Sequence, residues 1–193
     1  MAKVTLENLN KIFVSKIGKD VKAVNDFNLL LEDGEILALL GSSGCGKTTT
    51  LRMIAGFETA TSGQIKIGER IVNDLKPADR NVAMAFEGYA LYPPLTVRDN
   101  IAFSLMREKI SKDKVDSKVM EVAELLEITD ILERYPPSIS GGQQQRVSLA
   151  RALVRDSDAL LLDEPMSQLE PQLRAVLRAV SYTHLTLPTM DSV

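Results

Sequence analysis

A glycine-rich segment, residues 41–48, constrains the fold of this chain more than any other part of its sequence. It reads Gly41-Ser42-Ser43-Gly44-Cys45-Gly46-Lys47-Thr48 and matches the phosphate-binding loop pattern G-x-x-x-x-G-K-[ST]. An apolar run, residues 36–40, precedes it, and a helical pattern, residues 47–55, follows it. This strand–loop–helix order is the context that the pattern requires. A chance glycine-rich turn is the alternative, and the flanking elements argue against it.

The chemistry of such a loop explains its composition. Glycines allow backbone N–H groups to point inward at phosphate oxygens, and the following helix adds the positive end of its dipole. Lys47 is expected to reach the β- and γ-phosphates of a nucleotide, and Thr48 is expected to bind Mg²⁺. The segment therefore predicts a site for ATP with Mg²⁺.

Hydrophobic periodicity predicts an α/β fold with a helical insertion. Strands are expected at residues 4–6, 27–31, 36–40, 64–67, 82–86 and 159–162. Helical segments are expected at residues 47–55, 96–132 and 142–154. Residues 36–40 are apolar on both faces, so we expect a central strand that is covered on both sides. The insertion is expected to run from about Glu87 to about Val154.

A second motif ends the expected strand at residues 159–162. Asp163 and Glu164 follow it directly, and a buried strand delivers such residues to the carboxyl end of a sheet. Asp163 is placed to hold Mg²⁺, and Glu164 can polarise an attacking water. Acidic residues after a strand often form only a polar loop, and this alternative weakens when the motif is paired with residues 41–48.

A third motif is Ser140-Gly141-Gly142-Gln143-Gln144-Gln145-Arg146. Two glycines before a helix can create another cluster of amide groups that binds anions. A serine N-cap with flexible glycines is the alternative, and Ser-Gly-Gly by itself does not decide between the two.

The three motifs, in this order, resemble those of the ABC ATPase family. Ile139 to Gln143 is similar to the signature motif of that family, with Ile in place of the usual Leu. The resemblance covers residues 3 to about 179. It implies a P-loop NTPase fold with a RecA-like core, an N-terminal antiparallel β-subdomain and an inserted helical subdomain at about residues 87–154. We therefore expect residues 1–179 to form an incomplete ABC ATPase domain.

The resemblance also implies roles for individual residues. Phe13 matches the aromatic residue that stacks on adenine, and a plain core or surface phenylalanine is the alternative. Glu87 stands where the family has a glutamine that senses Mg²⁺ and the γ-phosphate. The expected nucleotide-binding residues are Phe13, Gly41, Ser42, Ser43, Gly44, Cys45, Gly46, Lys47, Thr48, Thr49, Ser140, Gly141, Gly142 and Gln143. The expected catalytic residues are Glu164 and Glu87, and the expected metal ligands are Thr48, Glu87 and Asp163.

The resemblance further implies partners. The working unit of the family is a head-to-tail dimer, so Ser140 and Gly142 are expected to contact the nucleotide of a second ABC ATPase subunit, identical or not. Residues 88–97 and 99–101 resemble the sugar-importer branch, of the maltose and glycerol-phosphate type, in which this stretch receives a coupling helix of a transmembrane permease. Its apolar and aromatic content suits a docking groove, and a plain core loop is the alternative.

The expected function is ATP-driven import of a carbohydrate or related solute, by a peripheral subunit at the cytoplasmic face of the plasma membrane. Two departures keep alternatives open. Glu87 places a carboxylate near the γ-phosphate, which repels the phosphate although it can bind Mg²⁺, and Glu170 replaces the usual aspartate of the D-loop. The alternatives are a degenerate, non-hydrolysing partner in a heterodimeric ABC ATPase and a soluble ABC ATPase.

The last residues depart from the family pattern more strongly. The switch histidine of the family is expected beyond Val193, and His184, the only histidine, lies too early. Residues 180–193 turn Thr-rich and, apart from Asp191, carry no Asp, Glu, Lys or Arg after a helical pattern rich in Arg, Ala and Leu, so we interpret them as a non-native tail. A natural strand that leads to a functional histidine is the alternative. We expect the chain to hydrolyse ATP poorly on its own.

Bulk properties exclude other classes of function. The net charge of −3 lacks the strongly basic character of a nucleic-acid-binding domain, so we expect no nucleic-acid partner. A single cysteine, Cys45, excludes an intramolecular disulfide. No apolar run is longer than that of residues 36–40, which is much shorter than the roughly 20 residues that span a membrane.

Overall fold

The computed structural model describes residues 1–15, 18–85, 90–106, 108 and 110–163. Its strands are β1 (Val4–Phe13), β2 (Val21–Leu31), β3 (Ser62–Ile67), β4 (Arg70–Ile71), β5 (Val82–Ala85) and β6 (Ala159–Leu162). Its α-helices are α1 (Lys47–Ala55), α2 (Val97–Phe103), α3 (Lys112–Leu125) and α4 (Gly141–Leu153). Short 3₁₀ helices occupy Pro77–Asp79, Thr129–Ile131 and Pro136–Ser138.

An antiparallel sheet in the order β2-β1-β3-β4 forms the N-terminal part of the molecule. β1 places Val4 and Leu6 in the core by simple alternation, and then a register shift follows between Leu6 and Leu9. Asn8 lies in the shift with a φ of 48°, a left-handed conformation that asparagine tolerates better than most residues. The shift returns Leu9 and Lys11 to the buried face. This sheet is the antiparallel β-subdomain that the sequence predicts.

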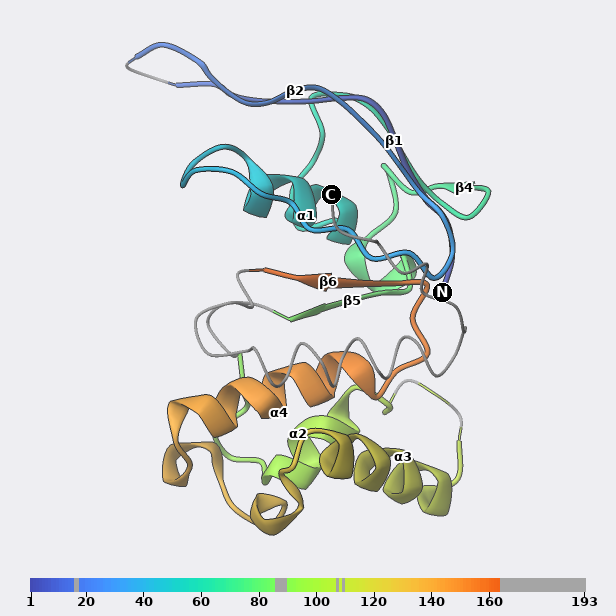
Figure 1. Ribbon diagram of the computed structural model, residues 1–193, viewed down its shortest axis with the longest axis vertical. Coiled ribbons are helices and arrows are strands. Elements are labelled where there is room, and N and C mark those ends of the chain that lie inside the picture. The colour runs from blue at the N-terminus through green and yellow to red at the C-terminus, as the bar shows by residue number, and fades with distance from the viewer. Residues whose placement is uncertain (16–17, 86–89, 107, 109, 164–193) are drawn as a thin grey trace, which may run out of the picture.

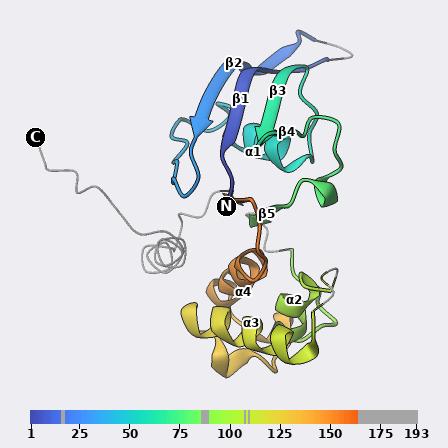
Figure 2. The same ribbon diagram turned by 90° about the vertical axis from the view of Figure 1, so that its right-hand side faces the viewer.

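β5 and β6 form a separate parallel pair, from Val82 opposite Ala159 to Ala85 opposite Leu162. Helix α1 lies between this pair and the N-terminal sheet, and α4 covers the other side of the pair (Figure 1). The view turned by 90° shows the same separation, with the sheet above and α2, α3 and α4 gathered below (Figure 2). The β5–β6 pair therefore lies between α1 on one side and α4 on the other.

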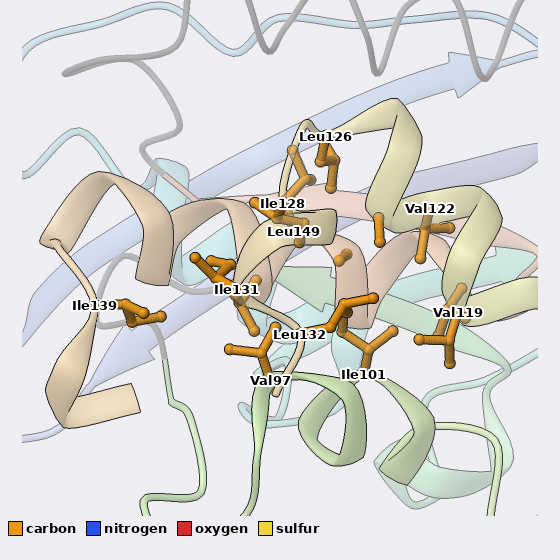
Figure 3. Close-up of a cluster of buried hydrophobic side chains, with 14 of the residues drawn as sticks. Val97, Ile101, Val119, Val122, Leu126, Ile128, Ile131, Leu132, Ile139 and Leu149 are labelled. Atoms are coloured by element: carbon orange, nitrogen blue, oxygen red, sulfur yellow. The ribbon is translucent and has the colours of Figure 1, made fainter. Parts of the chain in front are cut away.

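Two hydrophobic clusters meet at β6. Ala159 and Leu161 belong to the cluster that also contains Met53 and Ile54 of α1. Leu160 and Leu162 pack against the other cluster, which is built from the helices and the turns between them. Figure 3 shows the centre of that second cluster, where Val97, Ile101, Ile131 and Leu149 point toward one another. The alternating side chains of one short strand thus contact both cores.

Most of the expected elements are present with shifted ends. The helix at residues 47–55 and the strand at residues 159–162 have the predicted bounds. The helical stretch at residues 96–132 divides in two because Ser111 caps a new helix, accepting a hydrogen bond from the Lys114 N–H at 3.4 Å. β5 ends at Ala85, and the last residue of the expected strand, Phe86, lies outside the described residues.

The prediction of a covered central strand at residues 36–40 is wrong for this structure. The segment has no strand pairing, and Ile36, Leu37 and Leu40 are 56%, 44% and 91% exposed. The sequence pattern indicates only that the run is apolar on both faces. Burial of both faces also requires a neighbouring strand and a covering layer on each side. Among the described residues, none of the strands pairs with this run.

Candidate functional site

The glycine-rich loop enters helix α1 through backbone conformations that favour glycine. Gly44 and Gly46 have φ values of 80° and 95°. A Cβ on Gly46 would lie 2.3 Å from the carbonyl oxygen of Ala23 in β2, so this position needs glycine for packing as well. Gly46 is the N-cap of α1, and no side chain caps this end of the helix. The first N–H groups of α1 can therefore serve a bound anion.

Lys47 curls back over the loop. Its Nζ donates to the carbonyl oxygens of Gly41 at 2.8 Å and Ser42 at 3.0 Å, and it lies 3.6 Å from the Sγ of Cys45. Residues 41–45 are exposed, and residues 46–49, which include Thr49, are half-buried. The ammonium group of Lys47 is thus held close to the exposed backbone of the loop, an arrangement that suits phosphate oxygens.

Thr48 and Asp163 meet across the site. The Oγ1 of Thr48, in the first turn of α1, donates to the Oδ1 of Asp163 at 2.8 Å. Asp163 is buried directly after β6, and its N–H donates to the carbonyl of Ala85 at 3.1 Å. A hydroxyl and a carboxylate are the oxygen donors that Mg²⁺ prefers, so this pair fits the metal. Two residues 115 positions apart in the sequence therefore meet at the N-terminal end of α1.

Glu164 and Glu87, the two expected catalytic residues, lie outside the described residues. The same is true of the D-loop residues up to Glu170 and of His184. Their expected roles remain predictions.

Ser140 to Gln143 form the start of α4. The Oγ of Ser140 accepts from the N–H of Gln143 at 3.3 Å, and the Oε1 of Gln143 accepts from the N–H of Ser140 at 3.0 Å, a reciprocal capping box. Gly141 and Gly142 lie in the first turn. Helices α4 and α1 lie on opposite sides of the β5–β6 pair (Figure 1), so the structure does not bring this motif to the phosphate loop of the same chain.

Phe13 ends β1 and is 41% exposed. Phe13 lies opposite Val21 in β2. Two residues further along β2, the carbonyl of Ala23 lies next to Gly46, so this end of the β1–β2 pair runs beside the phosphate loop. The Nζ of Lys11 lies 4.8 Å from the centre of the Phe13 ring. The same ammonium donates to Glu58 at 2.7 Å and to the carbonyl of Thr59 at 2.8 Å. The hydrogen bond from Lys11 lowers the pKa of Glu58 below its ordinary value.

The structure places three polar residues in hydrogen-bond networks that the sequence does not reveal, although Asn100 lies in the 99–101 motif. Asn100 is fully buried, and its Nδ2 donates to the carbonyls of Tyr92, Leu95 and Thr96. Arg151 of α4 lies over the Tyr92 ring, 4.8 Å from its centre, and donates to the carbonyl of Ala90. Arg80 lies buried beneath the end of α1. A single charged or amide residue between apolar stretches resembles any surface residue, so only a signal of position, such as the Asp99-Asn100-Ile101 motif, could have found one of them.

Comparison with known proteins decides the family. Residues 24–167 match the family model described as ABC transporter. This chain belongs to the ABC transporter family.

Relatives within the ABC family share much of this sequence. The chain is 48% identical over 178 residues to the sn-glycerol-3-phosphate import ATP-binding protein UgpC of Ruegeria pomeroyi, which covers 92% of this chain and 49% of that protein. It is 50% identical over 185 residues to the trehalose/maltose import ATP-binding protein MalK of Thermococcus litoralis, covering 93% and 48%. The chain therefore spans about half the length of the curated relatives it matches.

Solved structures support the ABC fold. A structure described as a dimeric, post-hydrolysis state of the ATP-binding cassette MJ0796 bound to ADP and Pi superposes with a TM-score of 0.79 at 27% identity. The match covers 93% of this chain and 80% of that one. The described residues thus have the mixed α/β fold of an ABC cassette.

Proposed function

We propose that this chain binds ATP with Mg²⁺ and is part of the ATP-hydrolysing subunit of an ABC importer for a carbohydrate or related solute. The observation that carries the proposal is the 2.8 Å hydrogen bond between Thr48 and Asp163, at the entrance of a helix whose N-terminal amides lack a side-chain cap. The names of the relatives, which specify import of glycerol 3-phosphate or of trehalose and maltose, support the substrate class.

The residues divide the work by their chemistry. The loop amides and Lys47 bind the phosphates, and Thr48 and Asp163 hold Mg²⁺. The metal, when bound, neutralises charge that develops on the phosphate oxygens. Phe13, exposed beside the loop, offers its ring to adenine. By sequence position alone, we assign Glu164, the residue after Asp163, to orienting the attacking water, and Glu87 to sensing Mg²⁺ and the γ-phosphate.

A second ABC ATPase subunit completes the nucleotide site in this proposal. Ser140 to Gln143 lie across the β5–β6 pair from the phosphate loop of their own chain, so we assign them to the nucleotide of the partner. The description of the MJ0796 cassette as a dimer is consistent with this assignment.

Transmembrane permease subunits are the third component of the proposal. Tyr92 and Phe103 have ring centres 4.6 Å apart, and both rings are partly exposed beside the exposed Met106. Asn100 and Arg151 hold the loop that carries Tyr92. We assign this aromatic surface to permease docking, which would place the subunit at the cytoplasmic face of the membrane. Among the described helices, none is long and apolar enough to cross a bilayer.

The test measures equilibrium binding of a fluorescent ATP analogue in the presence of Mg²⁺. We expect Lys47→Ala to weaken binding by about a hundredfold or more, because the phosphates lose the ammonium group that the loop presents. Lys118→Ala, which removes an ion-paired lysine of α3, is the matched control and should bind like the unaltered chain. Equal affinity of the unaltered chain and Lys47→Ala would overturn the proposal.

A further inference from the structure

The guanidinium group of Arg80 lies under the C-terminal end of the helix that follows the phosphate loop. Arg80 is 3% exposed. Its Nη1 donates to the carbonyls of Met53 at 2.7 Å and Ile54 at 3.0 Å, both in the last turn of α1. Its Nε donates to Leu75 at 3.0 Å, and its Nη2 donates to Asn73 at 3.0 Å, again to carbonyl oxygens. One side chain thus joins α1 to the chain segment before β5.

The positive charge of Arg80 is buried, which is costly unless hydrogen bonds compensate for the lost water. In the described part of the chain, no carboxylate forms an ion pair with Arg80, so its hydrogen-bond partners are the four carbonyls. Burial lowers the pKa of the guanidinium, and the charge of Asp74 raises it. The negative end of the α1 dipole, together with the carbonyls, favours the cation at this position. A lysine could not reproduce the planar fork that reaches all four oxygens.

The surroundings of Arg80 are fitted to it closely. A Cβ on Gly56, the C-cap of α1, would lie 2.6 Å from the Nε of Arg80. Asn73, whose carbonyl accepts from Arg80, also accepts from the N–H of Ile65 and donates to the carbonyl of Gly63. The guanidinium is therefore held between the end of α1 and a loop that is itself bonded to β3.

A continuous series of contacts links the C-terminal end of α1 to the candidate metal site at its N-terminal end. β5 begins two residues after Arg80, pairs with β6 along its length and leads, through β6, to Asp163. Asp163 then accepts from Thr48 at the other end of α1. The nine-residue helix, about 13 Å long, is thus fastened to the β5–β6 pair at both ends.

We infer that Arg80 is a positioning residue for nucleotide binding: by holding the last turn of α1 against the segment that leads into β5, it sets where the loop amides and Thr48 stand relative to Asp163. This inference rests on the proposed function. A helix is stiff along its axis, so a shift at its C-terminal end moves the phosphate-binding end as well. Displacements of about 1 Å in a binding site can cost about a hundredfold in function.

The experiment compares the unaltered chain with Arg80→Met and Arg80→Lys, and with Arg98→Met as a control that removes a half-buried, ion-paired arginine. Dissociation constants for a fluorescent ATP analogue are measured with Mg²⁺ and with EDTA, well below the lowest melting temperature. We expect binding with Mg²⁺ to weaken about tenfold or more in Arg80→Met, with partial recovery in Arg80→Lys, and the gain in affinity from Mg²⁺ to shrink. Arg98→Met should bind like the unaltered chain.

A purely structural role predicts something different: lower melting temperatures, but unchanged dissociation constants and an unchanged gain from Mg²⁺ in the folded variants. That outcome would overturn the inference alone. Failure of the unaltered chain to bind nucleotide would overturn the proposed function together with the inference. If Arg80→Met does not fold, Arg80→Lys decides: weaker Mg²⁺-dependent binding supports the inference, and unchanged dissociation constants overturn it.

Discussion

Strand β6 and residues 36–40 each lead into one half of the candidate site, yet their surroundings differ. β6 pairs with β5, and its alternating side chains contact both hydrophobic clusters before the chain reaches Asp163. Residues 36–40 lead to the phosphate loop without a partner strand, and Leu40 is 91% exposed. Both runs are apolar on both faces. An apolar run of this kind therefore indicates what a segment can bury, whereas the neighbouring strands and helices determine what it does bury.

Truncation of one leucine in each run should have the largest and most different effects on stability. Leu161→Ala should lower the free energy of unfolding by about 2–5 kcal/mol, because it opens a cavity in the cluster where β6 packs against α1. Leu40→Ala should change it by no more than about 0.5 kcal/mol, as expected for an exposed position. Urea unfolding of both variants measures the two values. A large loss in Leu40→Ala would show that residues 36–40 are covered in solution.

The second prediction uses the exposure of the phosphate loop. Cys45 is the single cysteine of the chain, it is exposed, and its Sγ lies near the ammonium group of Lys47. Alkylation with N-ethylmaleimide should weaken ATP binding by at least about a hundredfold, or about 2.8 kcal/mol, because the adduct occupies space that the phosphates need. ATP should in turn protect the thiol, as followed by mass spectrometry. Alkylation at the same rate with and without ATP would contradict the prediction.

The third prediction concerns the point where the two runs converge. Asp163→Asn keeps the size of the side chain but removes its charge, so the part of the ATP affinity that depends on Mg²⁺ should fall about tenfold, or about 1.4 kcal/mol. Calorimetric titration with and without Mg²⁺ measures this contribution. Asp156→Asn, which alters an exposed carboxylate paired with Lys118, is the control and should leave it unchanged. An unchanged Mg²⁺ contribution in Asp163→Asn would argue against a metal-binding role.

The smallest expected effect lies in the ion pair that joins β1 to the end of α1. The bond from Lys11 lowers the pKa of Glu58, so the pair contributes its full stabilisation above the ordinary value of 4.5 and loses it as pH falls through the lowered pKa of the folded state. Lys11→Met should cost about 1 kcal/mol of unfolding free energy at pH 7.

The pH dependence provides the check on this ion pair. The difference in unfolding free energy between the unaltered chain and Lys11→Met should shrink as pH falls below 4.5, because Glu58 then becomes protonated in the unaltered chain. Urea unfolding at pH 7 and at several pH values below 4.5 measures that difference. A difference that stays constant over this range would assign the loss to packing of the lysine stem instead of to its charge.

Local chemistry made part of the site predictable. A phosphate loop binds through backbone amides and a lysine at fixed spacing. The sequence of residues 41–48 is therefore enough to predict phosphate binding. The helix after the loop was predicted with the observed bounds from its helical pattern, and β6 from its apolar run, which ends at Asp163. The exposure of residues 36–40 was not predictable, because the pattern contains no information on which strand stands beside them.

The phosphate loop and the helical segments before β6 follow from the sequence, because each depends on residues near one another in the chain. The antiparallel N-terminal sheet follows only from the family resemblance, since β1 pairs residues as distant as Val4 and Ile67. The contact of Thr48 with Asp163 and the contacts of Arg80 with the C-terminal end of α1 depend on the tertiary structure. Those contacts join distant segments, and a buried guanidinium or carboxylate finds its partners only when packed layers exclude water from it.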